Sequence, residues 1–260
     1  MDLYFAAVST RKHFREIFLD NEFFMLESFY YFKDWEHELI NSDKCLDFML
    51  DSGIFTFSYG KGGFDKINLD QYVDKYIAFI NKNNVDKFFE MDLDALLPLG
   101  KIEEVREKIE KGTGKQCIPV WHWARGQHYW EKMCQEYKYI ALGTDARRVK
   151  TNDIPLYNSM TRLAHKHNCK VHILGFSAPT EMRNVIADSC DSINWISGSV
   201  FHPKLFEFKE GKLTSKTIRK HLGMKHREVD THNLYEWMKF ATYLRKEKQN
   251  VYKEGLDMFL

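Results

Sequence analysis

Short apolar runs alternate with helical patterns along most of this chain, and this alternation limits the folds open to it. The apolar runs cover 48–54, 87–91, 118–121, 139–142, 171–176 and 193–196. Segments with helical spacing lie between them, at 69–80, 102–109 and 157–164, and more briefly at 180–186. Strands that alternate with helices at such intervals build right-handed βαβ units around a parallel sheet. The pattern therefore predicts an α/β fold.

Glycine placement and length distinguish an open sheet from a closed one. An open dinucleotide-binding sheet carries a Gly-rich turn after an early strand, and the one glycine cluster, at 60–63, precedes no convincing phosphate-binding helix. A length of 260 residues is typical of one (β/α)8 barrel. We therefore predict a TIM-like barrel as a single domain over 1–260. Its first strand should be 4–8, its second should lie near 25–32, and a closing helix should cover about 233–247.

The cysteines and the apolar stretches of the sequence indicate the cellular compartment in which the protein is expected. The five cysteines are odd in number, widely spread and contain no C-x-x-C pair, so we expect neither a disulfide framework nor a zinc ribbon. No apolar stretch approaches the roughly 20 residues that span a bilayer. The N-terminus also lacks the basic start and cleavage site of a signal peptide. These observations predict a cytoplasmic protein without a membrane partner.

A net charge of +1 means that any nucleic acid would have to be held by a local basic patch. The basic segment, residues 211–228, contains no acid before Glu228. Its candidate contacts are Lys212, Lys216, Arg219 and Lys220, while Arg147 and Arg148 form a second candidate group just beyond the 139–143 run. A solvated surface is the alternative interpretation of such a charge run.

Two aspartates begin Asp-Ser pairs directly after apolar runs. Asp51 and Asp191 would lie at strand ends, where burying a carboxylate is costly unless it has a partner or a task. Catalytic groups in a (β/α)8 barrel occupy the carboxyl ends of strands. The other candidates at such positions are Asp92 or Asp94, His122 and Gly143. Asp-Ser pairs also open turns, and Asp94 could simply cap a helix, so a structural role stays open for each residue alone.

Four motifs in order resemble one family. They are Asp51-Ser52-Gly53-Ile54-Phe55, the run 89–92, the run 139–143, and the run 171–175 followed by Cys190-Asp191-Ser192. Over about 45–201 the chain resembles the tRNA-guanine transglycosylases, and more closely the shortened phage DpdA-type enzymes that place 7-deazaguanine bases in DNA.

This resemblance implies base exchange, and for this chain we expect no cofactor and no metal. Asp191 would attack the anomeric carbon of a guanosine nucleotide, and Asp51 would serve as general acid and base in a double displacement. Asp92 would accept from the amino edge of the purine, Phe55 would stack on it and the Gly143 amide would donate to its carbonyl. Gly53 would let the backbone approach the base. The implied partners are DNA, with RNA as the alternative, and a free base such as 7-cyano-7-deazaguanine; the oligomeric state stays open.

The chain also departs from the family. Ile54 replaces a second glycine, His122 stands where the tRNA enzymes carry a glutamine, and their zinc-binding cysteine cluster has no counterpart. The loss of that cluster favours DNA over tRNA, with a tRNA-guanine transglycosylase as the alternative.

Two alternatives come from other classes. One is a non-catalytic nucleic-acid-binding barrel. The other is a metal-dependent hydrolase using His165 and His167, which end a helical pattern rather than a strand.

Overall fold

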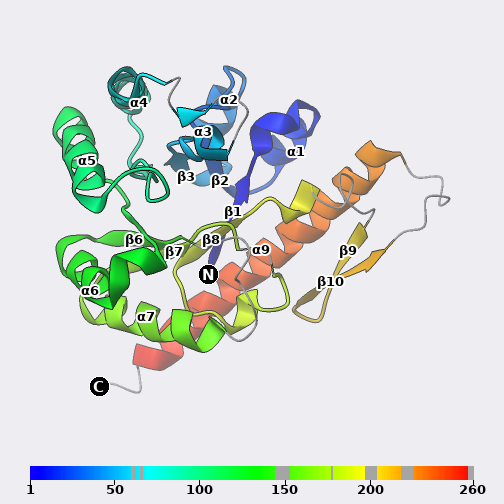
Figure 1. Ribbon diagram of the computed structural model, residues 1–260. Helices are drawn as coiled ribbons and strands as arrows, with labels where there is room; N and C mark the ends of the chain where they lie inside the picture. Colours follow the sequence, from blue (N-terminus) through cyan, green and yellow to red (C-terminus); the bar gives the residue numbers. More distant parts are fainter. Residues whose placement is uncertain are drawn as a thin grey trace. The chain divides into compact units, whose positions relative to one another are not determined.

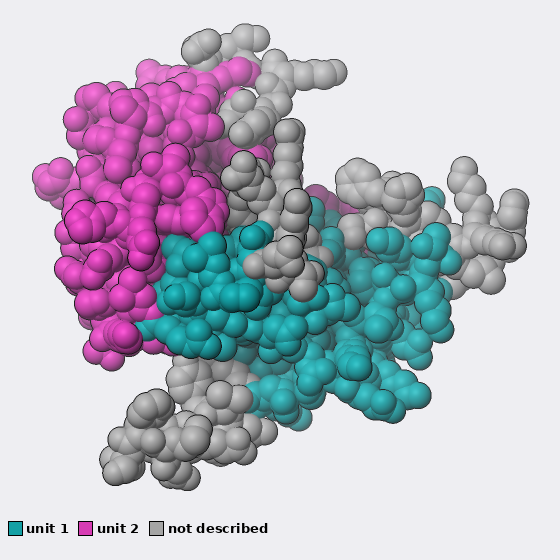
Figure 2. Space-filling model, turned by 60° about the horizontal axis from the view of Figure 1, so that its bottom comes forward, with its two compact units in different colours: residues 1–6, 144–162, 172–260 teal, residues 7–143, 163–171 magenta. Residues whose placement is uncertain are grey.

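The structure is a computed structural model (Figure 1). It describes residues 1–59, 63–64, 67–143, 153–176, 178–196, 204–217 and 225–256. The chain divides into two compact units, each assembled from separate stretches of sequence (Figure 2). Unit 1 contains residues 1–6, 144–162 and 172–260, and unit 2 contains residues 7–143 and 163–171.

Unit 2 contains strands that alternate with helices. Its strands are β2 (Phe23–Ser28), β3 (Cys45–Asp51), β4 (Lys87–Phe88), β5 (Val120–Trp121) and β6 (Tyr139–Leu142). Its helices are α1 (Arg15–Asp20), α2 (Glu36–Ile40), α3 (Phe55–Tyr59), α4 (Leu69–Lys82), α5 (Leu99–Thr113) and α6 (Gly126–Glu136), with short 3-10 turns at Val8–Thr10, Lys12–Phe14 and Trp123–Arg125. The pairs β2–β3, β3–β4 and β5–β6 are all parallel.

Unit 1 contains β1 (Asp2–Ala6) paired in parallel with β8 (Ser189–Ser192). It also contains the 3-10 turn Met182–Asn184, the antiparallel hairpin of β9 (Lys204–Lys209) and β10 (Lys212–Thr217), and the long helix α9 (His226–Leu256). The hairpin packs on α9: Asn233 and Glu236 accept hydrogen bonds from the amides of Phe206 and Phe208. Helix α7 (Ile154–Lys166) and strand β7 (Lys170–Ile173) have residues assigned to both units.

The eight strands β1 to β8 belong to one sheet in the order β4-β3-β2-β1-β8-β7-β6-β5. This confirms the predicted α/β class with a parallel sheet. The end strands β4 and β5 are not paired along their length. A single parallel bridge, Phe89 with Ile118, joins the segments next to them, through Glu90 N to Ile118 O at 3.0 Å and Ile118 N to Phe88 O at 2.8 Å.

Three predicted strand positions need correction. The first strand is Asp2–Ala6 rather than 4–8, and the second is Phe23–Ser28 rather than 25–32. The last is Ser189–Ser192 rather than 193–196, where a helical turn begins at 194. This strand pairs with β1 and with β7 and is buried throughout, so its register follows from neighbours rather than from its own polar sequence.

The helices of unit 2 follow the predicted periodicity because their apolar positions face one core. Asn68 caps α4 by accepting from the amide of Gln71, and the helix buries Val73, Tyr76 and Ile80. Tyr76 is completely buried, and its hydroxyl donates to the carbonyls of Leu50 and Phe89. Leu50 lies near the end of β3, and Phe89 directly follows β4. These bonds fix the strand ends where the candidate residues lie.

None of the five cysteines forms a disulfide, as the sequence predicts. Cys117, Cys134, Cys169 and Cys190 are buried and Cys45 is half-buried. Burial raises the pKa of Cys45 and of Cys134 to about 12, and it also raises the pKa of Cys117 and of Cys190 above the usual thiol value. Among the described helices, none combines the length and apolar character that a membrane crossing requires.

Two buried carboxyl side chains, Glu27 and Glu36, lie next to one another. Glu27 in β2 accepts from the amides of Ser9 and Ser28, and Glu36 at the start of α2 accepts from the amide of Lys33. Both side chains are almost fully buried. Burial and the neighbouring Glu27 carboxylate raise the pKa of Glu36 to about 8, and burial also raises the pKa of Glu27. Glu36 therefore holds a proton at neutral pH.

We expect the free energy of unfolding to fall as the pH rises from about 4.5 to about 8. The folded-state pKa of Glu36 lies above its unfolded value, so the folded protein binds the proton more tightly. The contribution of Glu36 to the free energy of unfolding is therefore complete below the unfolded pKa and is lost as the pH rises through the folded pKa. The loss is at most about 1.4 kcal/mol per pH unit. Urea denaturation at pH 5 and pH 8 measures the loss. Glu36→Gln should flatten it, and the exposed Glu38→Gln serves as control. Equal pH slopes for wild type and Glu36→Gln would contradict this assignment.

Candidate active site at the strand ends

Asp51 is the last residue of β3, at the carboxyl end of a strand as predicted. It is half-buried, and its Oδ2 accepts a hydrogen bond of 2.9 Å from the amide of Gly53. The hydroxyl of nearby Tyr72 donates to the carbonyl of Ser52 at 2.6 Å. Burial, with the Asp51 charge, raises the pKa of Tyr72, which therefore stays protonated. The Asp51 carboxylate is therefore oriented by the Gly53 amide, and the residue is only partly shielded from solvent.

The structure shows why position 53 must be a glycine, which the sequence does not reveal. Its φ of +72° is in the left-handed region, and a Cβ there would lie 2.5 Å from the Ser28 hydroxyl and 2.7 Å from the Tyr30 Cβ. The protein's own packing therefore requires glycine at this position, and the predicted approach of a base to the Gly53 backbone stays a prediction. Phe55 follows it at the start of α3 with 59% of its surface exposed, so its ring is accessible for stacking.

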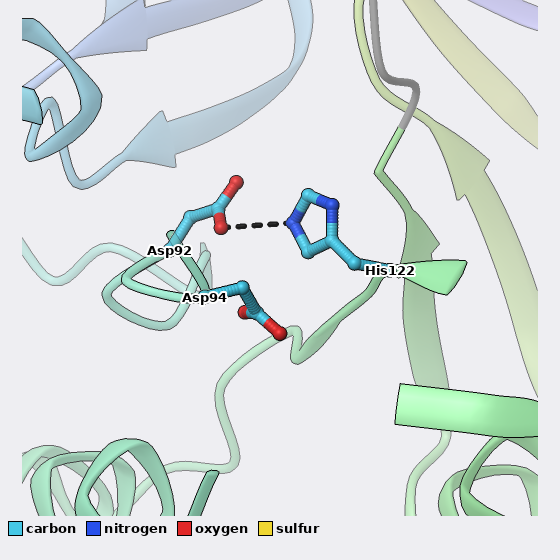
Figure 3. A group of neighbouring side chains, drawn as sticks. All are labelled: Asp92, Asp94 and His122. Atoms are coloured by element: carbon cyan, nitrogen blue, oxygen red, sulfur yellow. Dashed lines mark hydrogen bonds and ion pairs between the residues drawn. The ribbon is translucent and has the colours of Figure 1, made fainter. Parts of the chain in front are cut away.

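Three polar side chains from consecutive strand ends form one cluster in unit 2 (Figure 3). Asp92 and Asp94 follow β4, and His122 follows β5. Asp92 and His122 point toward one another, with His122 Nε2 2.8 Å from Asp92 Oδ1. Burial lowers the pKa of His122, but the hydrogen bond and charge of Asp92 outweigh it, so the pKa is raised.

Arg125 fixes the Asp94 carboxylate by two hydrogen bonds. Its Nε and Nη2 donate to the two carboxylate oxygens of Asp94 at 2.7 and 2.5 Å, and Nη2 also lies 3.0 Å from Glu90 Oε1. Glu90 is completely buried and also contacts Arg106 Nη1 at 3.2 Å. Burial raises the pKa of Glu90, while Arg125 and Arg106 oppose the rise. The buried ion pairs of Glu90 with Arg125 and Arg106 therefore hold the Asp94 carboxylate in place through Arg125.

Gly143 lies against the His122 ring. A Cβ at Gly143 would collide with the imidazole, so glycine makes room for it. The Gly143 amide donates to the carbonyl of Trp121 at 2.8 Å. Its predicted role as donor to a purine carbonyl is therefore corrected, because that hydrogen is already used in the pairing of β5 with β6.

Asp191 lies in β8 of unit 1 and is buried. Its Oδ1 accepts from the amide of Gly175 at 2.7 Å and lies 3.2 Å from His172 Nε2. The other ring nitrogen of His172 lies 2.5 Å from the hydroxyl of Ser189. The ring of Tyr4 packs edge-on against this imidazole at 5.8 Å. Asp191 is thus a buried carboxylate with an oriented partner.

The basic candidates are only partly described. Lys212 and Lys216 are exposed on β10, and Lys216 forms a loose ion pair with Glu207 at 3.8 Å. Arg219, Lys220, Arg147 and Arg148 lie outside the described residues. His165 and His167, weighed above as metal ligands, lie at the C-terminal end of α7 and just beyond it, as the sequence predicts.

Unit 2 brings Asp92 and His122 into direct contact and places Gly143 beside them, as the shared strand-end position predicts. Sequence reasoning missed His172 as the partner of Asp191, and the Arg125–Glu90–Arg106 network. A histidine in the strand paired with the aspartate's own strand was the available signal for His172.

The chain matches no protein-family model, and comparison with curated proteins gives no match either. An activity therefore has to be argued from the residues and their geometry.

Proposed function

We propose that this protein exchanges guanine in a nucleic acid for a 7-deazaguanine base through a covalent aspartyl intermediate. One observation carries the proposal: Asp51, His122, Gly143 and Asp191 lie at or next to the carboxyl ends of parallel strands, and Asp92 lies in the segment that follows β4. Catalytic groups of (β/α)8 enzymes occupy such positions. The strand order β1 to β8, together with the Phe89–Ile118 bridge, supports a barrel of this kind.

Asp191 would be the nucleophile. Both of its described contacts use Oδ1, which leaves Oδ2 as the oxygen that attacks the anomeric carbon. The bond from that carbon to guanine breaks as the aspartyl ester forms, and the leaving base takes a proton from Asp51. The incoming base then loses a proton to Asp51, its nitrogen attacks the same carbon and the ester breaks, so the sugar configuration is retained.

The cluster beside β4 and β5 would bind the base. Asp92 can accept from the amino edge of a purine, and His122, oriented by Asp92, can donate to its carbonyl. Phe55 offers an exposed ring for stacking. Gly143 contributes by leaving space for the His122 ring rather than by donating a hydrogen bond.

DNA is the favoured polymer. Lys212 and Lys216, with Arg219, Lys220, Arg147 and Arg148, would contact phosphates and offset the cost of flipping a base from the duplex. A tRNA substrate remains the second choice, and the cytoplasm, or the host cytoplasm for a phage protein, is the expected compartment.

Label transfer tests the activity. The purified protein should move radiolabelled guanine, or a labelled 7-deazaguanine base, into duplex DNA and not into tRNA. Uptake by tRNA alone would reassign the polymer. Binding of both polymers without any uptake, unchanged in Asp51→Asn and Asp191→Asn, would identify a non-catalytic nucleic-acid-binding protein instead.

A further inference from the structure

The cluster of Asp92, Asp94 and His122 has the ligand set of a transition-metal site. One ligand atom from each residue lies within 4.8 Å of the other two. Side-chain exposures of 23%, 14% and 25% leave all three reachable from solvent. A divalent ion binds oxygen and imidazole nitrogen at about 2.0–2.2 Å, so small rotations that open the Asp92–His122 hydrogen bond would complete the site. We infer that these three side chains bind one zinc-class divalent cation.

The surrounding contacts hold two of the ligands in place. Arg125 fixes the Asp94 carboxylate with a two-pronged hydrogen bond, and Arg125 is itself held by the buried Glu90. His122 packs against Gly143, and a Cβ at that position would lie 2.4 Å from the imidazole and displace it. Ligands supported by such outer contacts lose little freedom when a metal binds.

The charge balance favours a cation. Glu90 and Asp94 pair with the guanidiniums of Arg106 and Arg125, and Asp92 contacts the His122 imidazole. Arg106 also pairs with Glu103, whose charge is balanced by Lys132. A metal ion binds the neutral form of an imidazole, and with His122 in that form the connected groups carry one uncompensated negative charge. Arg125 opposes the ion locally, so we expect weaker binding than at a site without a guanidinium.

The ligand types select the metal. One imidazole with two carboxylates suits zinc and its neighbours, whereas magnesium and calcium prefer oxygen alone. Three protein ligands leave a further position for water, the arrangement of catalytic rather than structural zinc sites. The ion and a purine edge would exclude one another at Asp92 and His122. The inference concerns metal binding and does not depend on base exchange.

Calorimetric titration of the chelator-treated chain, residues 1–260, with zinc chloride tests the site. We expect one zinc per chain and little heat with magnesium chloride. Asp92→Asn and His122→Gln should each weaken zinc binding by at least about tenfold, in the range that loss of a metal's supporting groups produces. The exposed His128→Gln, and the double variant His165→Gln with His167→Gln, should bind as wild type does.

A spectroscopic readout keeps the test decisive if a variant fails to fold. Cobalt chloride added to the wild-type protein should give visible absorption of a four- or five-coordinate ion with nitrogen and oxygen ligands, and zinc should displace it. Absence of stoichiometric zinc binding would overturn the inference. So would full binding by His122→Gln, or loss of binding in the His165 and His167 variant.

Discussion

Asp191→Asn should abolish base exchange and prevent any protein–nucleotide adduct from forming. The amide cannot supply the attacking oxygen, although the contacts to Gly175 and His172 should keep the side chain in place. The rate should fall by at least about 10²-fold, the lower end of what one acid–base or nucleophilic group contributes. Denaturing gels of trapped reactions and label uptake would measure both effects.

Asp51→Asn is the matched comparison for that experiment. It removes the proton shuttle and leaves the proposed nucleophile, so polymer binding should persist while exchange becomes slow. An adduct that survives in Asp191→Asn would assign the nucleophile elsewhere. A crystal structure with the two carboxyls more than about 12 Å apart would exclude the mechanism, since a retaining pair lies about 5 Å apart.

Arg125→Met should destabilise the protein by about 3–5 kcal/mol, the usual cost of removing one partner from a buried ion pair. The Arg125 side chain is only 2% exposed, and its loss would leave Asp94 unpaired and Glu90, 0% exposed, with Arg106 as its cation. Methionine keeps much of the volume, so the effect reports on charge. Urea denaturation at pH 7 would measure it.

Lys101→Ala is the control, because Lys101 and its partner Glu104 are both more than half exposed. Exposed pairs of this type contribute little, so its denaturation midpoint should stay near that of wild type. If Arg125→Met were as stable as Lys101→Ala, the buried network would not hold the β4 and β5 strand ends in place.

The sequence predicted the elements that follow local rules. Helices α4 and α5 have clear apolar periodicity, and α4 has a capping Asn68, so both were found. Strand β8 was misplaced because Ser-Cys-Asp-Ser has no strand-like apolar pattern; its pairing with β1, more than 180 residues away in sequence, decides its position.

The same distinction applies to the candidate site. The position of Asp51 at the end of a strand could be predicted, whereas Asp191 lies within β8, the strand that the sequence misplaced. The partners were missed because the tertiary fold brings them together: His172 with Asp191, Glu27 with Glu36, and Arg125 with Glu90. The packing reason for Gly53 could not be predicted either, since Ser28 and Tyr30, which occupy the space that a side chain would need, are brought there by the fold.

The burial of the native cysteines makes this chain well suited to distance measurement. Because the thiols of Cys45, Cys117, Cys134 and Cys190 are poorly ionised at neutral pH, they should react slowly with maleimide or methanethiosulfonate reagents. One new cysteine at exposed Phe55, the first residue of helix α3 in unit 2, and another at exposed Ile193 of unit 1 could therefore carry spin labels selectively. Pulsed dipolar spectroscopy on that pair would give the separation of the two strand ends in solution, with and without nucleic acid.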